Sequence, residues 1–254
     1  MEKPADSRAR ADVFLLVSIA LTVVLWAVPY GRIVGYPLML VSTLVHELGH
    51  GIAGVLVGGS FQSFEMWSNG SGLAHVVGYD GRFARAIVSA GGLVGPACAA
   101  AVGFAMARGE RRARVMLLSL GVLLLLGDLL IVRSVFGWVF VTLFALSLLW
   151  TGTRASGWAS QLTLLFLSVQ LALSVFSRGD YLFTDKAHTG GGVFPSDVAN
   201  MADALFLPYW FWGALCGAFS LAVLLIGAWS FLREGRTAST EKRDLTGRHG
   251  GAKL

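Results

Sequence analysis

Long apolar runs, separated by short polar segments, dominate the sequence. The first run, Val13 to Gly31, contains no charged residue and has about the twenty residues that a helix needs to cross a bilayer. It is longer than the apolar part of a typical signal peptide, so we interpret it as a first span. Similar runs follow at 34–57, 86–107, 115–132, 134–150, 155–177 and 204–232. The pattern predicts an all-α polytopic membrane protein with about six or seven transmembrane helices.

One segment between the apolar runs has the pattern of a β-hairpin. Phe61–Trp67 and Leu73–Tyr79 are short stretches rich in aromatic and β-branched residues, and an Asn69-Gly70 turn sequence lies between them. Open sheet edges are not tolerated against lipid, so we expect this small hairpin at the membrane interface or in a protein-lined cavity. It is either a structural loop or a strand edge along which an extended peptide can pair.

Composition and charge agree with a membrane protein. Hydrophobic residues make up 55% of the chain and charged residues 14%, with a mean hydropathy of +0.68, whereas about a quarter of an average soluble domain is charged. The net charge of +5 is concentrated in loops and tail, so we expect the lipid bilayer and no nucleic acid as a partner. Cys98 and Cys216 lie in apolar runs, which favours reduced packing residues.

Two basic segments indicate how the chain crosses the membrane. The loop Arg108–Arg114 holds four arginines and one glutamate, and we expect it on the cytoplasmic side. The tail 233–254 is basic and rich in Gly, Ser and Thr, so we expect it to be disordered and cytoplasmic. Three apolar runs precede the arginine loop. If that loop is cytoplasmic, either the N-terminus lies on the opposite side of the membrane or one early segment is only half inserted.

Candidate chemistry is concentrated in the second apolar run. His46-Glu47-Leu48-Gly49-His50 places two imidazoles four residues apart, on one face of a helix, where both can bind one zinc ion. Two imidazoles and a carboxylate are costly at membrane depth, which favours a functional role. Glu47 is then the candidate general base, and peptide hydrolysis is the natural chemistry. A third protein ligand must come from another helix.

Three carboxylates outside the motif are candidates for the third ligand. Asp197 follows Pro195 and opens a helix, although Ser196 or Asp197 could equally serve as the helix cap. Asp180 lies just past the end of a predicted span, where the flanking residues fix its backbone less firmly than that of Asp197. Asp128 is an intramembrane carboxylate, but pairing with Arg133 is a simpler explanation for it.

At these residues the chain resembles the site-2 protease family of intramembrane zinc metallopeptidases, in its compact form without a PDZ domain. The resemblance implies a single membrane metallopeptidase domain over 1–232, zinc as cofactor, and a cut within or near the transmembrane segment of a membrane-protein substrate. It also implies a multi-pass protein of a bacterial cell membrane. It depends on the His46–His50 motif, Gly58-Gly59 with the hairpin carrying Ser71-Gly72, Ala90-Gly-Gly-Leu-Val-Gly-Pro96, and Pro195–Ala202 ahead of Leu207-Pro-Tyr-Trp-Phe-Trp.

The chain departs from this family at the third ligand. Better-studied members take it from an aspartate in an Asn-Pro-x-Pro-x-x-Asp-Gly loop, and that string does not occur here. Asp197 is the nearest equivalent. His75 in the hairpin is a candidate substrate contact, although a structural histidine is the simpler interpretation. Asp185 and His188 are expected on a solvated loop.

Two other functions remain consistent with the sequence. The first is a non-catalytic membrane scaffold derived from such a protease, which the missing aspartate loop would explain. The second is an ion or proton transporter that uses His46, Glu47 and Asp128 as a relay, although transporters usually contain paired repeats and none is found here.

Overall fold

The computed structural model describes residues 31–177 and 182–250, together with five isolated positions before residue 31. The predicted first span therefore lies mostly outside the described residues, as does Asp180. Six of the described helices are long and apolar enough to cross a membrane, which confirms the predicted fold class. They are α2 (Gly31–Leu56), α3 (Arg82–Met106), α4 (Glu110–Ile131), α5 (Val135–Arg154), α6 (Gly157–Ser177) and α8 (Tyr209–Gly250).

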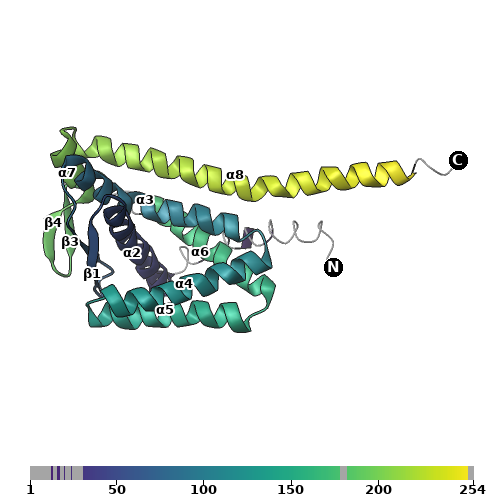
Figure 1. Ribbon diagram of the computed structural model, residues 1–254, viewed down its shortest axis with the longest axis horizontal. Helices are drawn as coiled ribbons and strands as arrows, with labels where there is room; N and C mark the ends of the chain where they lie inside the picture. The colour runs from purple at the N-terminus through teal and green to yellow at the C-terminus, as the bar shows by residue number, and fades with distance from the viewer. Residues whose placement is uncertain are drawn as a thin grey trace.

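Short connections give the helix bundle two distinct ends (Figure 1). The links 107–109 and 155–156 lie at one end, which we call the loop end, and a hydrogen bond from Gln161 to the carbonyl of Ala107 joins α6 to the first of these links. The opposite end, which we call the hairpin end, holds the α4–α5 link, two β-hairpins and the short helix α7 (Asp197–Leu205). Helix α2 crosses the others obliquely near the hairpin end.

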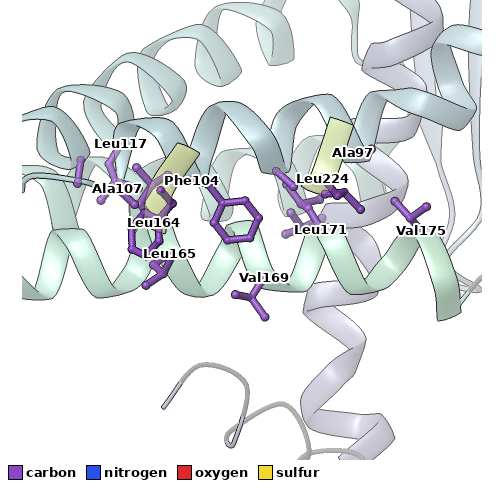
Figure 2. Close-up of a cluster of buried hydrophobic side chains, with 14 of the residues drawn as sticks. Ala97, Phe104, Ala107, Leu117, Leu164, Leu165, Val169, Leu171, Val175 and Leu224 are labelled. Carbon is purple, nitrogen blue, oxygen red and sulfur yellow. The ribbon is translucent and has the colours of Figure 1, made fainter. Parts of the chain in front are cut away.

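The largest apolar core lies between α3, α4, α6 and α8 (Figure 2). Phe104 of α3 packs on Phe231 of α8 with ring centroids 6.3 Å apart, near the loop end. Close packing matters here because lipid tails are as apolar as the side chains, so van der Waals contact holds membrane helices together. The labelled members of this core include Ala97, Ala107, Leu117, Leu164, Leu165, Val169, Leu171, Val175 and Leu224.

Helices α2 and α3 meet through glycines, with backbone directly against backbone. A Cβ atom added at Gly91 would lie 2.6 Å from the carbonyl oxygen of Gly49, and one at Gly95 would lie 3.3 Å from the Gly49 Cα. Small residues at a helix interface allow two backbones to approach this closely. We call the contact of Gly49 with Gly91 and Gly95 the glycine seam, and it fixes the histidine-bearing helix against α3.

The predicted hairpin is confirmed as strands β1 (Ser60–Met66) and β2 (Gly72–Val77), which pair antiparallel with an irregularity between Phe61 and Ser63. The outer edge of β1 is occupied by the α4–α5 link, since Arg133 N donates to the Phe64 carbonyl at 2.9 Å and Met66 N donates to Ser134 Oγ at 2.8 Å. Strand β2 lies on the other side of the hairpin, next to α2.

A second hairpin was not predicted from the sequence. Strands β3 (Lys186–Thr189) and β4 (Gly192–Pro195) pair antiparallel inside the segment that we interpreted as a polar loop. Its turn contacts the turn of the first hairpin, because Gly190 N donates to Ser71 Oγ at 2.9 Å and the Trp67 ring covers the face of Gly190, leaving no space for a side chain there. The second hairpin thus leads the chain into α7.

The long C-terminal helix differs from the prediction at its far end. A break interrupts the apolar run 204–232 before this helix, with Phe206 in the left-handed region at φ 67° and α8 beginning one residue after Pro208. Its span ends at Phe231, but the helix continues to Gly250, where the composition of 233–254 predicts disorder. A helix that is already nucleated extends readily through residues such as Arg, Glu, Ala and Lys, which accounts for the difference.

Removal of Arg236 to Leu254 is expected to leave the fold and any activity of the protein nearly unchanged. The last span ends before this segment, and Phe231, which packs on Phe104, is retained. Thermal unfolding and activity of the truncated protein in detergent would test this expectation. A large loss of either property, with expression unchanged, would show that the tail contributes to the folded domain.

Candidate metal centre

Helix α2 brings the two histidines of the motif together. His46 and His50 are one turn apart, and their Nε2 atoms lie 3.2 Å from each other, with the rings nearly perpendicular. Both side chains are largely buried, with exposed fractions of 13% and 11%. Two ring nitrogens directed at one point, away from bulk water, are what the sequence spacing predicts for a metal site.

The orientation of His50 depends on α3. Its Nδ1 lies 2.8 Å from the carbonyl oxygen of Val88, so Nδ1–H is the donor and Nε2 is left with its lone pair toward His46. The ring lies against Gly92, and a Cβ atom at that position would overlap Nε2. Neither Val88 nor Gly92 is predicted as a site residue from the sequence, although the pair Gly91-Gly92 is a signal that could have indicated Gly92.

Asp197 completes the group from a different part of the chain. Its Oδ2 lies 3.1 Å from His46 Nε2 and its Oδ1 lies 3.3 Å from His50 Nε2. The helix-capping alternative belongs to Ser196, whose Oγ accepts from Ala199 N at 3.1 Å and donates to the Thr184 carbonyl at 2.6 Å. Asp197 is therefore not needed as the cap of α7, and its carboxylate is directed at the histidines.

The spacing of these donor atoms fits a zinc ion. Ligand nitrogen and oxygen atoms about 2.0–2.2 Å from zinc at tetrahedral angles are roughly 3.3–3.5 Å apart, close to the 3.1–3.3 Å separations here. Oδ2 of Asp197 is buried and, within the described residues, has no hydrogen-bond partner. A carboxylate binds a metal ion in its ionised form, and neutral imidazoles bind it through a ring nitrogen, so this donor set suits a divalent cation.

Glu47 lies beside this group, with only 6% of its surface exposed. The backbone of Ala74 in β2 hydrogen-bonds to its carboxylate. Gly72 allows β2 to come this close, because a Cβ atom there would lie 2.9 Å from Glu47 Oε1. Thr43 donates to the Gly70 carbonyl at 2.7 Å and joins the turn of the hairpin to the same helix. The first hairpin thus positions the candidate general base.

The structure does not bring the other candidates to this group. Asp128 accepts a hydrogen bond from Thr142 of α5, whereas the Arg133 guanidinium donates to the carbonyls of Leu130 and Val132, so the predicted Asp128–Arg133 pairing is wrong for the described residues. Asp128 is in α4 whereas Arg133 lies in the α4–α5 link, and the two side chains bond to different partners. His75, Asp185 and His188 are exposed, and Asp180 lies outside the described residues.

An apolar cavity of about 860 Å³ borders the site on the side of α2 away from β2. Its walls come from helices α2 to α8, and they include Gly91 of the glycine seam and Met201, one turn after Asp197 in α7. Cys216, which is buried and free, also lines it, as does the free Cys98. The cavity therefore offers an almost wholly hydrophobic surface close to the candidate metal ligands.

Fold and site together define a class, which is a polytopic helical membrane protein with a buried His-His-Asp group beside a glutamate. A family model described as Peptidase M50B-like matches residues 15–227, which is most of the chain, and the protein belongs to that family. This supports the resemblance to the site-2 proteases and indicates an intramembrane metallopeptidase. No curated protein and no solved structure matches the chain.

Proposed function

We propose that this protein is a zinc-dependent intramembrane endopeptidase, with His46, His50 and Asp197 as metal ligands and Glu47 as general base. The observation that supports this most strongly is the convergence of buried donor groups from α2 and α7 next to a buried glutamate: the two imidazole Nε2 atoms lie 3.2 Å apart, and each lies within 3.3 Å of one oxygen of Asp197. Burial of two imidazoles and two carboxylates in a membrane protein costs free energy, and a purely structural role would not explain why that cost is tolerated.

The proposed chemistry is hydrolysis of a peptide bond. When bound, zinc would polarise the scissile carbonyl and lower the pKa of a water molecule to about 7. Glu47 takes a proton from the attacking water and delivers it to the leaving amine nitrogen, while the water oxygen adds to the carbonyl carbon. The hydrogen bond from Ala74 holds the Glu47 carboxylate in place for both transfers. Val88 fixes the tautomer of His50 that offers Nε2 to the metal.

We propose that the substrate is a membrane protein whose cleaved segment lies extended along β2. The outer edge of β1 is occupied by the α4–α5 link, so β2 is the strand next to Glu47 with an edge to offer. Pairing with a strand edge would hold a peptide by its main chain, which a protease needs because helical peptide bonds are inaccessible. The apolar cavity beside α2 suits the hydrophobic residues that flank such a cut.

The proposal is tested by metal content and cleavage measured on the same preparation. Purified full-length protein should contain about one zinc per chain, and should cut a reconstituted transmembrane substrate in a reaction that a chelator stops and zinc restores. The His46→Ala variant should lose both properties. Zinc without cleavage of any substrate would favour the scaffold alternative, and a folded protein without zinc would favour the ion relay.

Substitution of Gly92 by alanine is expected to reduce zinc affinity at least tenfold, and turnover with it. The added methyl group would occupy the position of His50 Nε2, so the ring would have to rotate away from the other two donors. Gly127→Ala is a matched control in α4, because a Cβ atom there meets only Ile131 at 3.8 Å. Equal zinc affinity in the two variants, measured by competition with a chelator, would contradict the role given to Gly92.

The location follows from the same proposal. We place the protein in a bacterial cell membrane, as the resemblance to compact bacterial members implies, with the C-terminal tail in the cytoplasm. The arginine loop and the basic tail support this orientation, since positively charged segments are retained on the cytoplasmic side.

A further inference from the structure

The apolar cavity beside α2 opens onto the surface that the helix bundle presents to lipid. Helices α2 and α8 both pack on α3, and the cavity extends across α3 between them. Several large apolar side chains in its wall are exposed, and they come from all three helices; they are Ile52, Leu56, Ile87, Val102, Leu215 and Phe219. A wall of this kind offers water no hydrogen bonds, so in a membrane the opening is filled by hydrocarbon.

The cavity is long enough to hold an acyl chain along α3. Its wall on this helix extends from Ile87 to Gly103, sixteen residues or about 24 Å along the helix axis. One leaflet of a bilayer contributes about half of the 30 Å hydrocarbon thickness, roughly 15 Å. Phe83, which is 75% exposed, lies one turn before Ile87 on the same face, so the apolar wall continues to the start of the helix. An acyl chain that enters there has room to extend over the depth of a leaflet.

Two arginines lie at the end of α3 where this wall begins. Arg82 and Arg85 are exposed in the first turn of the helix, on either side of Phe83 in sequence. Trp210, which is 55% exposed, lies at the start of α8 at the same end of the bundle, and exposed aromatic residues are typical of a bilayer interface. Within the described part of the chain neither arginine has an ion pair, and the exposed Asp80 and Asp203 pair with neither. Both guanidinium groups are therefore available to an anion at the level of the lipid headgroups.

The ring of Phe206 supports the guanidinium group of Arg82. The guanidinium carbon lies over this ring, 3.5 Å from its centroid. A guanidinium group that contacts a ring through its face keeps its N–H donors at the rim, where they can bind phosphate oxygens in pairs. The fold gains little from the ring itself, because Phe206 is 79% exposed and its backbone lies in the left-handed region at φ 67°, which is unfavourable for a bulky residue.

From these observations we infer that α3 and α8 form a binding site for an anionic phospholipid. The phosphate group binds Arg82 and Arg85, and one acyl chain lies in the apolar cavity along α3. A phospholipid is the ligand that combines a negative charge at the membrane boundary with a long apolar chain below it. The inference does not rest on the proposed function, because lipid binding requires neither zinc nor catalysis. A substrate segment that entered the cavity would displace the acyl chain.

The lipid affinity of the purified full-length protein tests the inference. Mass spectrometry of intact protein–lipid complexes in detergent, with either phosphatidylglycerol or phosphatidylcholine added, gives the two affinities. Phosphatidylglycerol should bind at least about tenfold more tightly, and the double variant Arg82→Gln/Arg85→Gln should lose this preference. The double variant Arg111→Gln/Arg112→Gln is the matched control, because it removes the same charge from exposed positions at the loop end and should keep the preference.

Three results would overturn the inference. Equal affinities of the unmodified protein for the two lipids would show that no anionic headgroup is recognised, and the same loss in both double variants would show only general attraction to charge. Displacement of the bound lipid by millimolar inorganic phosphate would indicate a site for a free anion without the acyl chain. The affinities should be unchanged in a Glu47→Gln background, so a failure of the proposed catalysis does not affect this test.

Substitution of Phe206 by glycine separates lipid binding from a structural role. Glycine adopts the left-handed backbone without strain, so thermal stability should be unchanged or higher. Loss of the ring beneath Arg82 should nevertheless lower the affinity for phosphatidylglycerol at least about threefold. Reduced stability together with unchanged lipid affinity would show that the ring serves the fold alone.

Photolabelling locates the acyl chain. Phosphatidylglycerol with a photoreactive diazirine in one acyl chain is bound to the protein and irradiated, and the labelled peptides are identified by mass spectrometry. The label should be found on residues 87–103 of α3 and on α8 near Leu215 and Phe219. Labelling that is no stronger there than on the exposed faces of α4 and α5, which carry Leu123 and Leu143, would reject the cavity as the site of the chain.

Discussion

The Glu47→Gln protein is expected to bind zinc normally and to lose proteolysis by a factor of about a thousand. Glutamine preserves the size of the side chain and can still accept the hydrogen bond from the Ala74 backbone, but it cannot take up a proton from water. General acid–base catalysis contributes roughly 10²–10⁴ in rate, and here one carboxylate performs both proton transfers. Bound zinc and initial rates of substrate cleavage, measured on the same preparation, test the assignment.

Glu110→Gln provides the matched control for this substitution. It makes the same chemical change in an exposed residue at the loop end, far from the donors, so both zinc and activity should be retained. Normal cleavage by Glu47→Gln would remove Glu47 from the mechanism. Loss of zinc in that variant would instead make it a contributor to metal binding.

The Asp197→Ala protein is expected to lose at least about a hundredfold in zinc affinity, with a corresponding loss of turnover. Removal of a partner that only orients a ligand already costs 10–100-fold, and Asp197 supplies donor oxygens 3.1 and 3.3 Å from the two imidazole nitrogens. Two imidazoles alone would hold zinc weakly in a site that normally has three protein ligands. Competition with a chromogenic chelator gives the affinity directly.

Two further variants make this experiment decisive. Asp203→Ala removes an exposed carboxylate from the same helix, α7, and should have no effect on zinc. Asp180→Ala tests the other candidate that the sequence offers for the third ligand. Full metal occupancy in Asp197→Ala together with loss in Asp180→Ala, at matched thermal stability, would transfer the assignment to Asp180.

Much of the fold could be predicted because the relevant signals are local in sequence. Charge-free runs identified the long helices, and the Asn69-Gly70 turn with its flanking aromatic residues identified the first hairpin. The spacing of His46 and His50 determines their proximity on a helix, so this half of the site needed no tertiary information. Asp197 was favoured over Asp180 because it follows a proline and opens a helix, and the structure places it at the histidines.

The features that sequence reasoning missed depend on contacts between distant segments. The strands of the second hairpin have four residues each, too few to show an alternating pattern, and the turn between them bonds to the turn of another hairpin. Asp128 and Arg133 were paired because they are near in sequence, but Thr142 from the next helix competes for the carboxylate. The contact of His50 with Val88 involves a backbone carbonyl, which any residue at position 88 would present.

The glycine seam between α2 and α3 limits how this protein could be engineered for greater stability. Exchange of helical glycines for alanine is a common way to gain about 0.5–1 kcal/mol each, because alanine loses less backbone entropy on folding. Alanine at Gly49 or Gly91 would instead be destabilising, since the added methyl group would push apart the two helix backbones that fix the histidines. Gly35 and Gly127, which have open space or ordinary contacts, remain suitable positions for thermostabilised variants intended for crystallisation.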